Sequence, residues 1–200
     1  MNPFRAIAVL LLLLVVSGCS SLAPPPTLYV LEAPAAAAPA APKAAPAGTG
    51  RRLAVALGPV TVPDYLDRTD IVRRATGNRL EFNADERWAE PLRAGLQRLL
   101  IAALAERLGP GYWVTAGTGR LSQIDIEVPV DIEAFEEDAS GRAVLTASWE
   151  IRAGAHVTRD RTSYHRVLAS TRVEDRVRAL SADAADLAAD LATAIRAHGP

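Results

Sequence analysis

The side chains that could carry out catalysis are few and scattered along the 200-residue sequence. Histidine occurs only as His156, His165 and His198, and Cys19 is the single cysteine. The chain contains no HExxH metal-binding motif, no GxSxG nucleophile motif and no glycine-rich phosphate loop. His156 and His165 could face each other across a hairpin, but two surface histidines are far commoner than a two-ligand metal site. We therefore expect no enzymatic activity, no catalytic residue, no cofactor and no metal site.

A row of carboxylates is the other candidate for chemistry. Asp125, Glu127, Asp131 and Glu133 alternate with apolar residues and could hold calcium, and the acidic run continues to residue 138. Alternate residues of a strand lie about 6.6 Å apart on one flat face, too regular for a coordination cage without help from loops. Two of them could be drawn as glycosidase carboxylates, but nothing raises the pKa of one above another. The row is better explained as the solvent-facing side of a sheet.

The first 18 residues have the order of a secretory signal peptide. Arg5 supplies a positive charge, Ala6 to Val16 is an uninterrupted apolar run, and the small residues Ser17 and Gly18 precede Cys19. The run has 11 residues, whereas a membrane-spanning helix needs about 20. We expect residues 1–18 to be cut off rather than kept as a membrane span.

The sequence from Val16 to Cys19 resembles the lipobox, at which diacylglycerol is attached to the cysteine thiol before cleavage. We therefore expect Cys19 to be lipidated. Two or three acyl chains, at about 0.8 kcal/mol per buried methylene, would anchor the chain to the periplasmic face of a membrane. Ser20 follows, and a residue other than Asp there resembles the default for outer-membrane delivery in enteric-type lipoproteins. This favours the outer membrane over the inner membrane.

Residues 19–50 form the lipidated N-terminus and a tether. From Ala33 to Ala47 every residue is Ala or Pro except Lys43, a composition that buries little and interrupts regular helix. As polyproline II, at about 3.1 Å per residue, this stretch would reach roughly 45 Å. The β-prone run at residues 27–31 precedes it, and residues 28–31 could pair with the sheet of the domain. The flexible leash would then be only residues 20–26.

Residues 51–197 are expected to form one domain. Residues 53–57 and 80–82 are strand candidates. Asn83, with Glu86 three residues later, fits a helix N-cap, so a helix should begin near Ala84 and end at Gly109-Pro110, with a kink or a later start at Pro91. The apolar stripe of this helix would comprise Trp88, Leu92, Leu96, Leu99, Leu100, Ala103 and Leu104.

The clearest periodicity runs from Ile124 to Ala134, where apolar and polar residues alternate strictly. This predicts a strand with one buried face and one wet face. A turn at residues 138–141 leads into an alternating partner at 145–151, and a third strand should follow near 164–173. Ser181 would then cap a last amphipathic helix. Together these predict an α+β domain of two layers, a mainly antiparallel sheet with two amphipathic helices on one face.

Composition excludes some classes of protein and leaves room for a core. Half of the residues are hydrophobic and the formal net charge is −1, so the sequence gives no support for nucleic-acid binding. Trp88, Trp113 and Trp149 could stack on a ligand, but each occupies an apolar position of its own expected element, and core packing is the better explanation.

These features together resemble the PqiC-like family of ABC-type transport auxiliary lipoproteins, which are accessory to transporters carrying MCE (mammalian cell entry) domains. Their order and spacing matter more than any single one. The motifs are the lipobox at Cys19, Leu28 to Leu31, Gly58 to Pro63 leading to Tyr65-Leu66-Asp67-Arg68, Asn78 to Phe82, and Arg87 to Leu92.

The resemblance implies a role in moving phospholipid or related apolar molecules between the two membranes. An MCE-domain protein, a permease and an ATPase would be separate chains, and this chain would be the lipidated periplasmic piece. Within it, Tyr65, Leu66, Asp67 and Arg68 are expected to meet a partner, because interface hot spots favour an aromatic residue beside an arginine. Equally, this loop could pack on its own domain.

Two other functions stay open. A stand-alone lipid-binding lipoprotein would need a large apolar cavity, whereas the helical pattern here is fully used for a core. A structural lipoprotein of an unrelated envelope assembly would share the same anchor and tether. The sequence also leaves open whether the chain forms a homo-oligomer.

Overall fold

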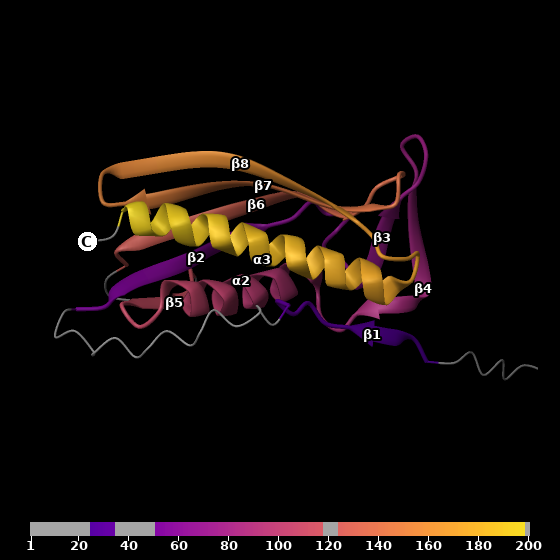
Figure 1. The fold of residues 1–200 in the computed structure, drawn as a ribbon, viewed down its shortest axis with the longest axis horizontal. Coiled ribbons are helices and arrows are strands. Elements are labelled where there is room, and N and C mark those ends of the chain that lie inside the picture. Colours follow the sequence, from indigo (N-terminus) through magenta and orange to yellow (C-terminus); the bar gives the residue numbers. More distant parts are fainter. Residues whose placement is uncertain (1–24, 35–50, 118–123, 199–200) are drawn as a thin grey trace, which may run out of the picture.

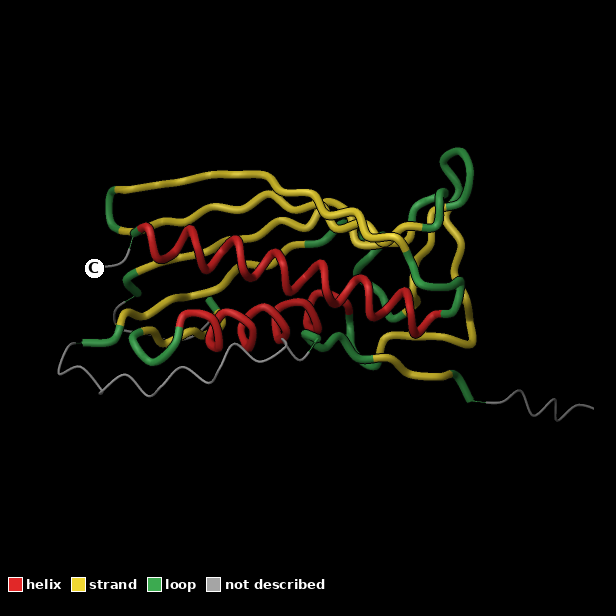
Figure 2. Tube along the Cα trace, viewed as in Figure 1, coloured by secondary structure: helices red, strands yellow, loops and turns green. Residues whose placement is uncertain are grey.

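Two helices lie on one side of an eight-stranded sheet in the described part of the chain (Figures 1 and 2). The computed structural model describes residues 25–34, 51–117 and 124–198, so the expected signal peptide, Cys19 and most of the expected tether lie outside the described residues. The predicted α+β class with both helices on one face is confirmed. The elements are β1 (Thr27–Tyr29), β2 (Leu53–Thr61), β3 (Asp70–Arg74), β4 (Leu80–Trp88), α2 (Leu92–Leu108), β5 (Tyr112–Ala116), β6 (Ile126–Glu137), β7 (Arg142–Ala153), β8 (His156–Val167) and α3 (Val173–Ala197).

Strand β6 organises the sheet. One edge of β6 pairs with β7, which pairs in turn with β8, and both pairings are long and antiparallel. The other edge of β6 pairs in parallel with β2 over Ile126 to Asp131 and meets β3 at Glu137. Strand β2 also pairs in parallel with β5, and β3 continues through β4 to β1. The β1–β4–β3 group therefore forms one end of the molecule, which we call the flap (Figure 1).

The predicted hairpin is present, although its first strand begins at Ile126 and leaves Ile124 exposed. Ile132, Ala147 and Ile151 are fully buried toward the helices, as the alternation requires. The turn from β6 to β7 is organised by Asp138, whose carboxylate accepts hydrogen bonds from the backbone N–H groups of Ser140 and Arg142. Burial opposes the charge on Asp138, but these bonds and those from the side chains of both residues outweigh it and lower its pKa to about 2.

The helix start predicted near Ala84 is wrong, and the alternative of a later start at Pro91 is confirmed. Residues 80–88 are strand β4, held between β3 and β1, and α2 begins only at Leu92 after Pro91. Strand pairing on both sides outweighs the local capping signal, and proline, which lacks an N–H group, is tolerated at the start of a helix. Trp88 is nevertheless buried, with its ring 6.3 Å from that of Phe135.

The last helix begins earlier than predicted. Helix α3 starts at Val173, and Ser181 is a buried residue in its interior rather than a cap. Charged residues on the buried side concealed the first two turns, because Asp175 and Arg176 are both buried. Arg176 donates to Glu137 of β6 at 2.5 Å, which satisfies both buried charges.

The third strand of the ribbon also lies earlier than predicted. Strand β8 spans His156–Val167 rather than residues 164–173. It follows β7 directly through Gly154, whose φ of +59° suits a tight turn. Nearly every residue of β8 is exposed, so the strand carries no hydrophobic alternation that a sequence could reveal.

The β-prone run before the tether is part of the sheet. Strand β1 pairs in parallel with β4, placing Leu28 opposite Arg87 and Tyr29 opposite Trp88. The Tyr29 hydroxyl donates to Glu174 of α3 at 3.1 Å, and Leu31 is buried. This segment is therefore packed against the domain.

Candidate functional site

The loop between β2 and β3 holds the four residues expected to meet a partner. The backbone N–H groups of Leu66 and Asp67 donate to the carbonyl oxygen of Pro63 at 2.8 and 3.1 Å, which closes a tight turn. Leu66 is only 1% exposed and belongs to the core. Its burial fixes the loop to the domain and leaves its neighbours on the surface.

Tyr65 is half-buried and contacts the ion pair between Arg74 and Glu136. The Arg74 guanidinium lies over the Tyr65 ring, 5.9 Å from its centroid, and donates to the tyrosine hydroxyl at 3.4 Å. Arg74 also donates to Glu136 of β6 at 2.5 Å. Burial and the nearby Glu136 raise the pKa of Tyr65. Tyr65 therefore has a structural role in joining the loop, β3 and β6.

Asp67 ties the loop to the helical layer. Its Oδ2 atom is 2.9 Å from an Arg93 nitrogen on α2. The other oxygen, Oδ1, is buried without a hydrogen-bond partner in the described part of the chain. This contact joins the loop to α2.

Arg68 is the most accessible of the four residues, with its side chain 42% exposed. Its guanidinium lies 4.2 Å above the centroid of the Phe82 ring, and its Nε atom donates to Asp70 at 2.7 Å. Asp70 also lies 3.9 Å from Arg87, which is opposite Leu28 in the sheet. A continuous surface strip thus crosses the flap, formed by Phe82, Arg68, Asp70, Arg87 and Leu28.

The residues of the acidic run lie in two different environments. Asp131 and Glu133 lie on the uncovered face of the sheet, where Thr61 donates to Asp131 and Arg161 pairs with Glu133 at 2.7 Å. Hydrogen bonds from Arg161 and Ser148 lower the pKa of Glu133. In contrast, Glu136 and Glu137 are buried. No three His, Cys, Asp or Glu residues in the described ranges are arranged to hold a metal ion.

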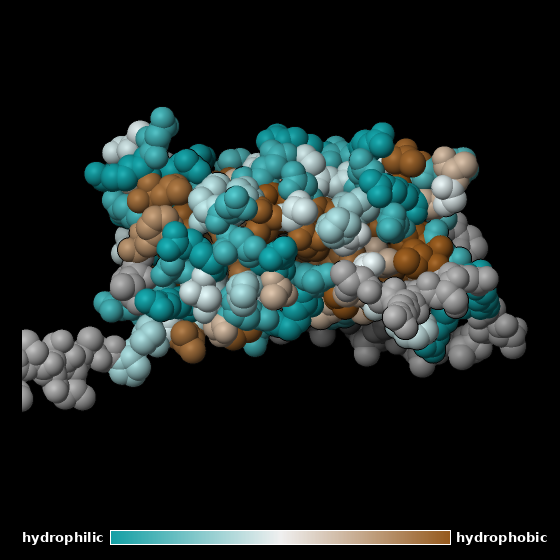
Figure 3. Space-filling model, turned by 180° about the vertical axis from the view of Figure 1, so that it is seen from behind, coloured by the Kyte–Doolittle hydropathy of each residue, from teal (hydrophilic) through white to brown (hydrophobic). Residues whose placement is uncertain are grey.

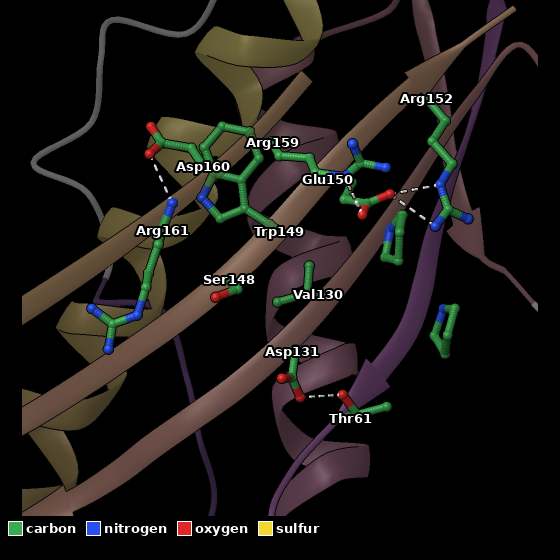
Figure 4. A pocket seen from close by; sticks show the side chains of 12 residues that line it. Thr61, Val130, Asp131, Ser148, Trp149, Glu150, Arg152, Arg159, Asp160 and Arg161 are labelled. Atoms are coloured by element: carbon green, nitrogen blue, oxygen red, sulfur yellow. Dashed lines mark hydrogen bonds and ion pairs between the residues drawn. The ribbon is translucent and has the colours of Figure 1, made fainter. Parts of the chain in front are cut away.

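A cavity of about 490 Å³ opens on this uncovered face. Figure 4 shows Glu150 between Arg159 and Arg152, and Thr61 facing Asp131. Every arginine at its rim pairs with a carboxylate, as Arg159 does with Glu150 at 2.6 Å. Its charges are therefore balanced among themselves rather than arranged for an ionic ligand.

The sequence matches a family model described as the ABC-type transport auxiliary lipoprotein component, over residues 29–192. The match begins at the last residue of β1, covers β2 to β8 and all of α2, and ends within α3. The chain belongs to this family. No curated protein matches the sequence.

Solved structures support the auxiliary lipoprotein fold. A crystal structure of an uncharacterized protein, 20% identical, superposes with a TM-score of 0.71 and covers 86% of this chain and 99% of its own. Protein XCC0632 from Xanthomonas campestris, 18% identical, superposes with a TM-score of 0.60 and covers 82% and 92%. At these identities the likeness establishes the fold alone.

Three further observations concern the family and the described residues. The family is one of transport accessories, which is not a catalytic role. His156 and His165 lie on the same strand, β8, so they do not face each other across a hairpin. No helix in the described ranges is both long and apolar enough to cross a membrane.

Two aromatic residues of the auxiliary lipoprotein domain have surroundings that the sequence did not reveal. Trp88 and Trp149 are in the core as expected, but Trp113 on β5 is 59% exposed, so its predicted burial is wrong. Phe82 is 44% exposed beneath Arg68. Trp113 and Phe82 lie in strands whose burial depends on the segments that pack against them. The local spacing of apolar residues does not show which segments these are.

Proposed function

We propose that this chain is the lipid-anchored, periplasm-facing subunit of an MCE-type ABC transport system that moves lipids or related apolar molecules across the envelope. The observation that carries the proposal is the family match over residues 29–192. The sequence at Cys19 supports the anchor, and Ser20 favours the outer membrane. Energy transduction and the passage of cargo would belong to the ATPase, the permease and the MCE-domain protein.

Packing favours an accessory role over that of a stand-alone lipid carrier. The apolar side chains of α2 and α3, including Leu96, Leu100, Leu187 and Leu191, are fully buried within the core. A carrier would need an apolar cavity of several hundred cubic ångströms within such a layer. The apolar faces of both helices are instead used for packing.

Within this role, the loop from Tyr65 to Arg68 is the proposed contact with a partner protein. Leu66 and Tyr65 hold its shape, and Asp67 is already paired with Arg93. Arg68 and Phe82 then present a stacked, exposed arginine and aromatic pair, a combination that is enriched in interface hot spots. The rigid support beneath them lowers the entropy cost of binding.

Crosslinking in intact cells tests the assembly. The full chain, with a C-terminal tag, would be purified after a mild crosslink and its companions identified. Recovery of an MCE-domain protein is expected. Recovery of the chain alone with bound lipid would instead indicate an independent carrier, and recovery of an unrelated envelope assembly would indicate a structural lipoprotein.

The contact loop has a matched test within the flap. Arg68→Ala should lower recovery of the partner several-fold and leave the melting temperature nearly unchanged, because exposed ion pairs contribute little stability. Arg79→Ala is the control, since Arg79 is 70% exposed and also pairs with a carboxylate, that of Glu81. Equal recovery with the two variants would contradict the contact without affecting the family assignment.

A further inference from the structure

The chain between the expected anchor and the first strand is short. Cys19 and Pro25, the first described residue, are six positions apart. Even a fully extended chain covers only about 3.3 to 3.6 Å per residue, so this distance is at most roughly 20 Å. If Cys19 carries lipid, as the proposed function requires, the start of β1 stays this close to the bilayer. The surface around β1 is therefore the part of the described domain nearest to the membrane.

The segment that contains β1 has one face packed against the domain and one face exposed. Tyr29 and Leu31 contact the domain: Tyr29 donates a hydrogen bond to Glu174, and Leu31 is buried in the core. Leu28 and Val30 alternate with them and are 61% and 42% exposed. Pairing in the sheet thus holds the segment in place without covering its two outward apolar side chains.

Arginines flank the two apolar side chains. Arg87, with its side chain 43% exposed, lies opposite Leu28. Arg178, 66% exposed, lines a groove of about 210 Å³ together with Val30, between β1 and α3. Long arginine side chains can rest their apolar stems against such a surface and hold the guanidinium at the level of lipid headgroups. Glu32 and Glu174 line the same groove, so apolar insertion, rather than net positive charge, must provide the attraction.

We propose that the exposed face of residues 28–30 docks on the surface of the bilayer that holds the anchor, with Leu28 and Val30 entering the headgroup region. This inference rests on the proposed lipidation of Cys19. Two apolar side chains would bind a membrane weakly by themselves, but a short tether makes the contact intramolecular and raises its effective concentration.

Docking at β1 would orient the whole domain. Strand β1 lies at one end of the long axis, whereas the turn from β7 to β8 lies at the other end (Figure 1). The far end would then project away from the membrane. It carries Val157 just after this turn, 47% exposed, which provides a control position at the opposite end.

Single-cysteine labelling tests the contact. Cys19 is the single cysteine, so in the acylated chain Leu28→Cys or Val30→Cys would introduce the one free thiol, and Val157→Cys would do so at the far end. Each full-length variant would carry an environment-sensitive fluorophore in vesicles of phosphatidylethanolamine and phosphatidylglycerol. We expect blue-shifted emission, and several-fold stronger quenching by brominated acyl chains, at positions 28 and 30 than at 157. The difference should persist at high salt.

The outcomes separate this contact from the proposed function. If the chain floats with the vesicles but all three labels report water, docking is overturned and the anchor is retained. If the acylation-competent chain stays in the aqueous phase, both are overturned. A blue shift that needs an added MCE-domain protein rather than vesicles would assign this surface to a protein partner and overturn the lipid contact. Loss of the shift at high salt would overturn the insertion of Leu28 and Val30, because it would indicate an electrostatic attraction.

Discussion

The two faces of the β6–β7–β8 ribbon come from the same strands but are held together by different forces. Toward the helices, Ile132, Ala147 and Ile151 are fully buried. On the other face the same strands carry cross-strand ion pairs, such as Glu133 with Arg161. Figure 3, which views the molecule from behind, shows mainly hydrophilic residues there with separate hydrophobic patches.

The difference shows where stability resides. Burial of apolar area provides about 25 cal/mol per Å², whereas exposed ion pairs provide about 0 to 1 kcal/mol each. The covered face should therefore determine whether the domain folds. The uncovered face should tolerate substitution, which leaves it free to meet other molecules.

The largest expected effect is on the covered side. Leu187→Ala on α3 removes a fully buried side chain and should lower the free energy of unfolding by about 3 to 4 kcal/mol, because a cavity remains. Urea denaturation measures this. Leu28→Ala, at an exposed leucine, is the control and should change stability by less than about 0.5 kcal/mol. Similar losses of unfolding free energy in the two variants would contradict the conclusion that stability resides on the covered side.

Ionisation of the buried Asp183 carboxyl should lower the free energy of unfolding as the pH rises. Burial raises its pKa to about 6, although Arg166, 2.9 Å away, works in the opposite direction. Because the folded chain holds this proton more tightly than the unfolded chain, stability is lost as the pH increases from about 4 to 6, by roughly 2 to 3 kcal/mol. Asp183→Asn should remove this loss. Parallel pH profiles of unfolding for the two proteins would show that Asp183 is not responsible.

Asp138 should have the opposite pH dependence. Its turn hydrogen bonds lower the pKa to about 2, so it stabilises the fold above about pH 4, and this contribution is lost as the pH falls toward 2. Asp138→Asn should cost about 1 to 2 kcal/mol at pH 7 and little at pH 2. Chemical denaturation at both values checks this, and an equal cost at both would rule out titration as the cause.

The smallest effect is expected on the uncovered face. Arg161 is 62% exposed where it pairs with Glu133. A double-mutant cycle of Arg161→Ala with Glu133→Ala should give a coupling free energy below about 1 kcal/mol that decreases further in high salt. A coupling of several kcal/mol would mean that this face contributes to folding as the covered face does.

Local pattern was sufficient where apolar and polar residues alternate along most of an element. The β6–β7 hairpin was predicted because its apolar residues alternate without interruption, and the organising turn at Asp138 lies where expected. The start of α3 was missed because the charged residues Asp175 and Arg176 occupy its buried side. Ser170, Arg172 and Arg178 accommodate the charge of Asp175, and Glu137 accommodates that of Arg176. A hydropathy pattern does not show these contacts.

The candidate site was found only in part. The loop at Tyr65 to Arg68 was identified through the family resemblance, and the structure places Arg68 on its surface. Phe82 and Leu28 were not connected with it, because they belong to β4 and the N-terminal segment. Only strand pairing brings these three segments together.

The sequence by itself determined the α+β class, the alternating hairpin, the apolar faces of the two helices and the family, because each depends on residue type at fixed spacing along one segment. Tertiary structure decided that residues 80–88 form a strand, that Trp113 is exposed, and that β1 presents Leu28 and Val30 outward. The physical reason is that burial and strand pairing depend on the partner segment. The partners of β1 and β5 lie far away in sequence, and β4 is held by the distant β1 as well as by its neighbour β3.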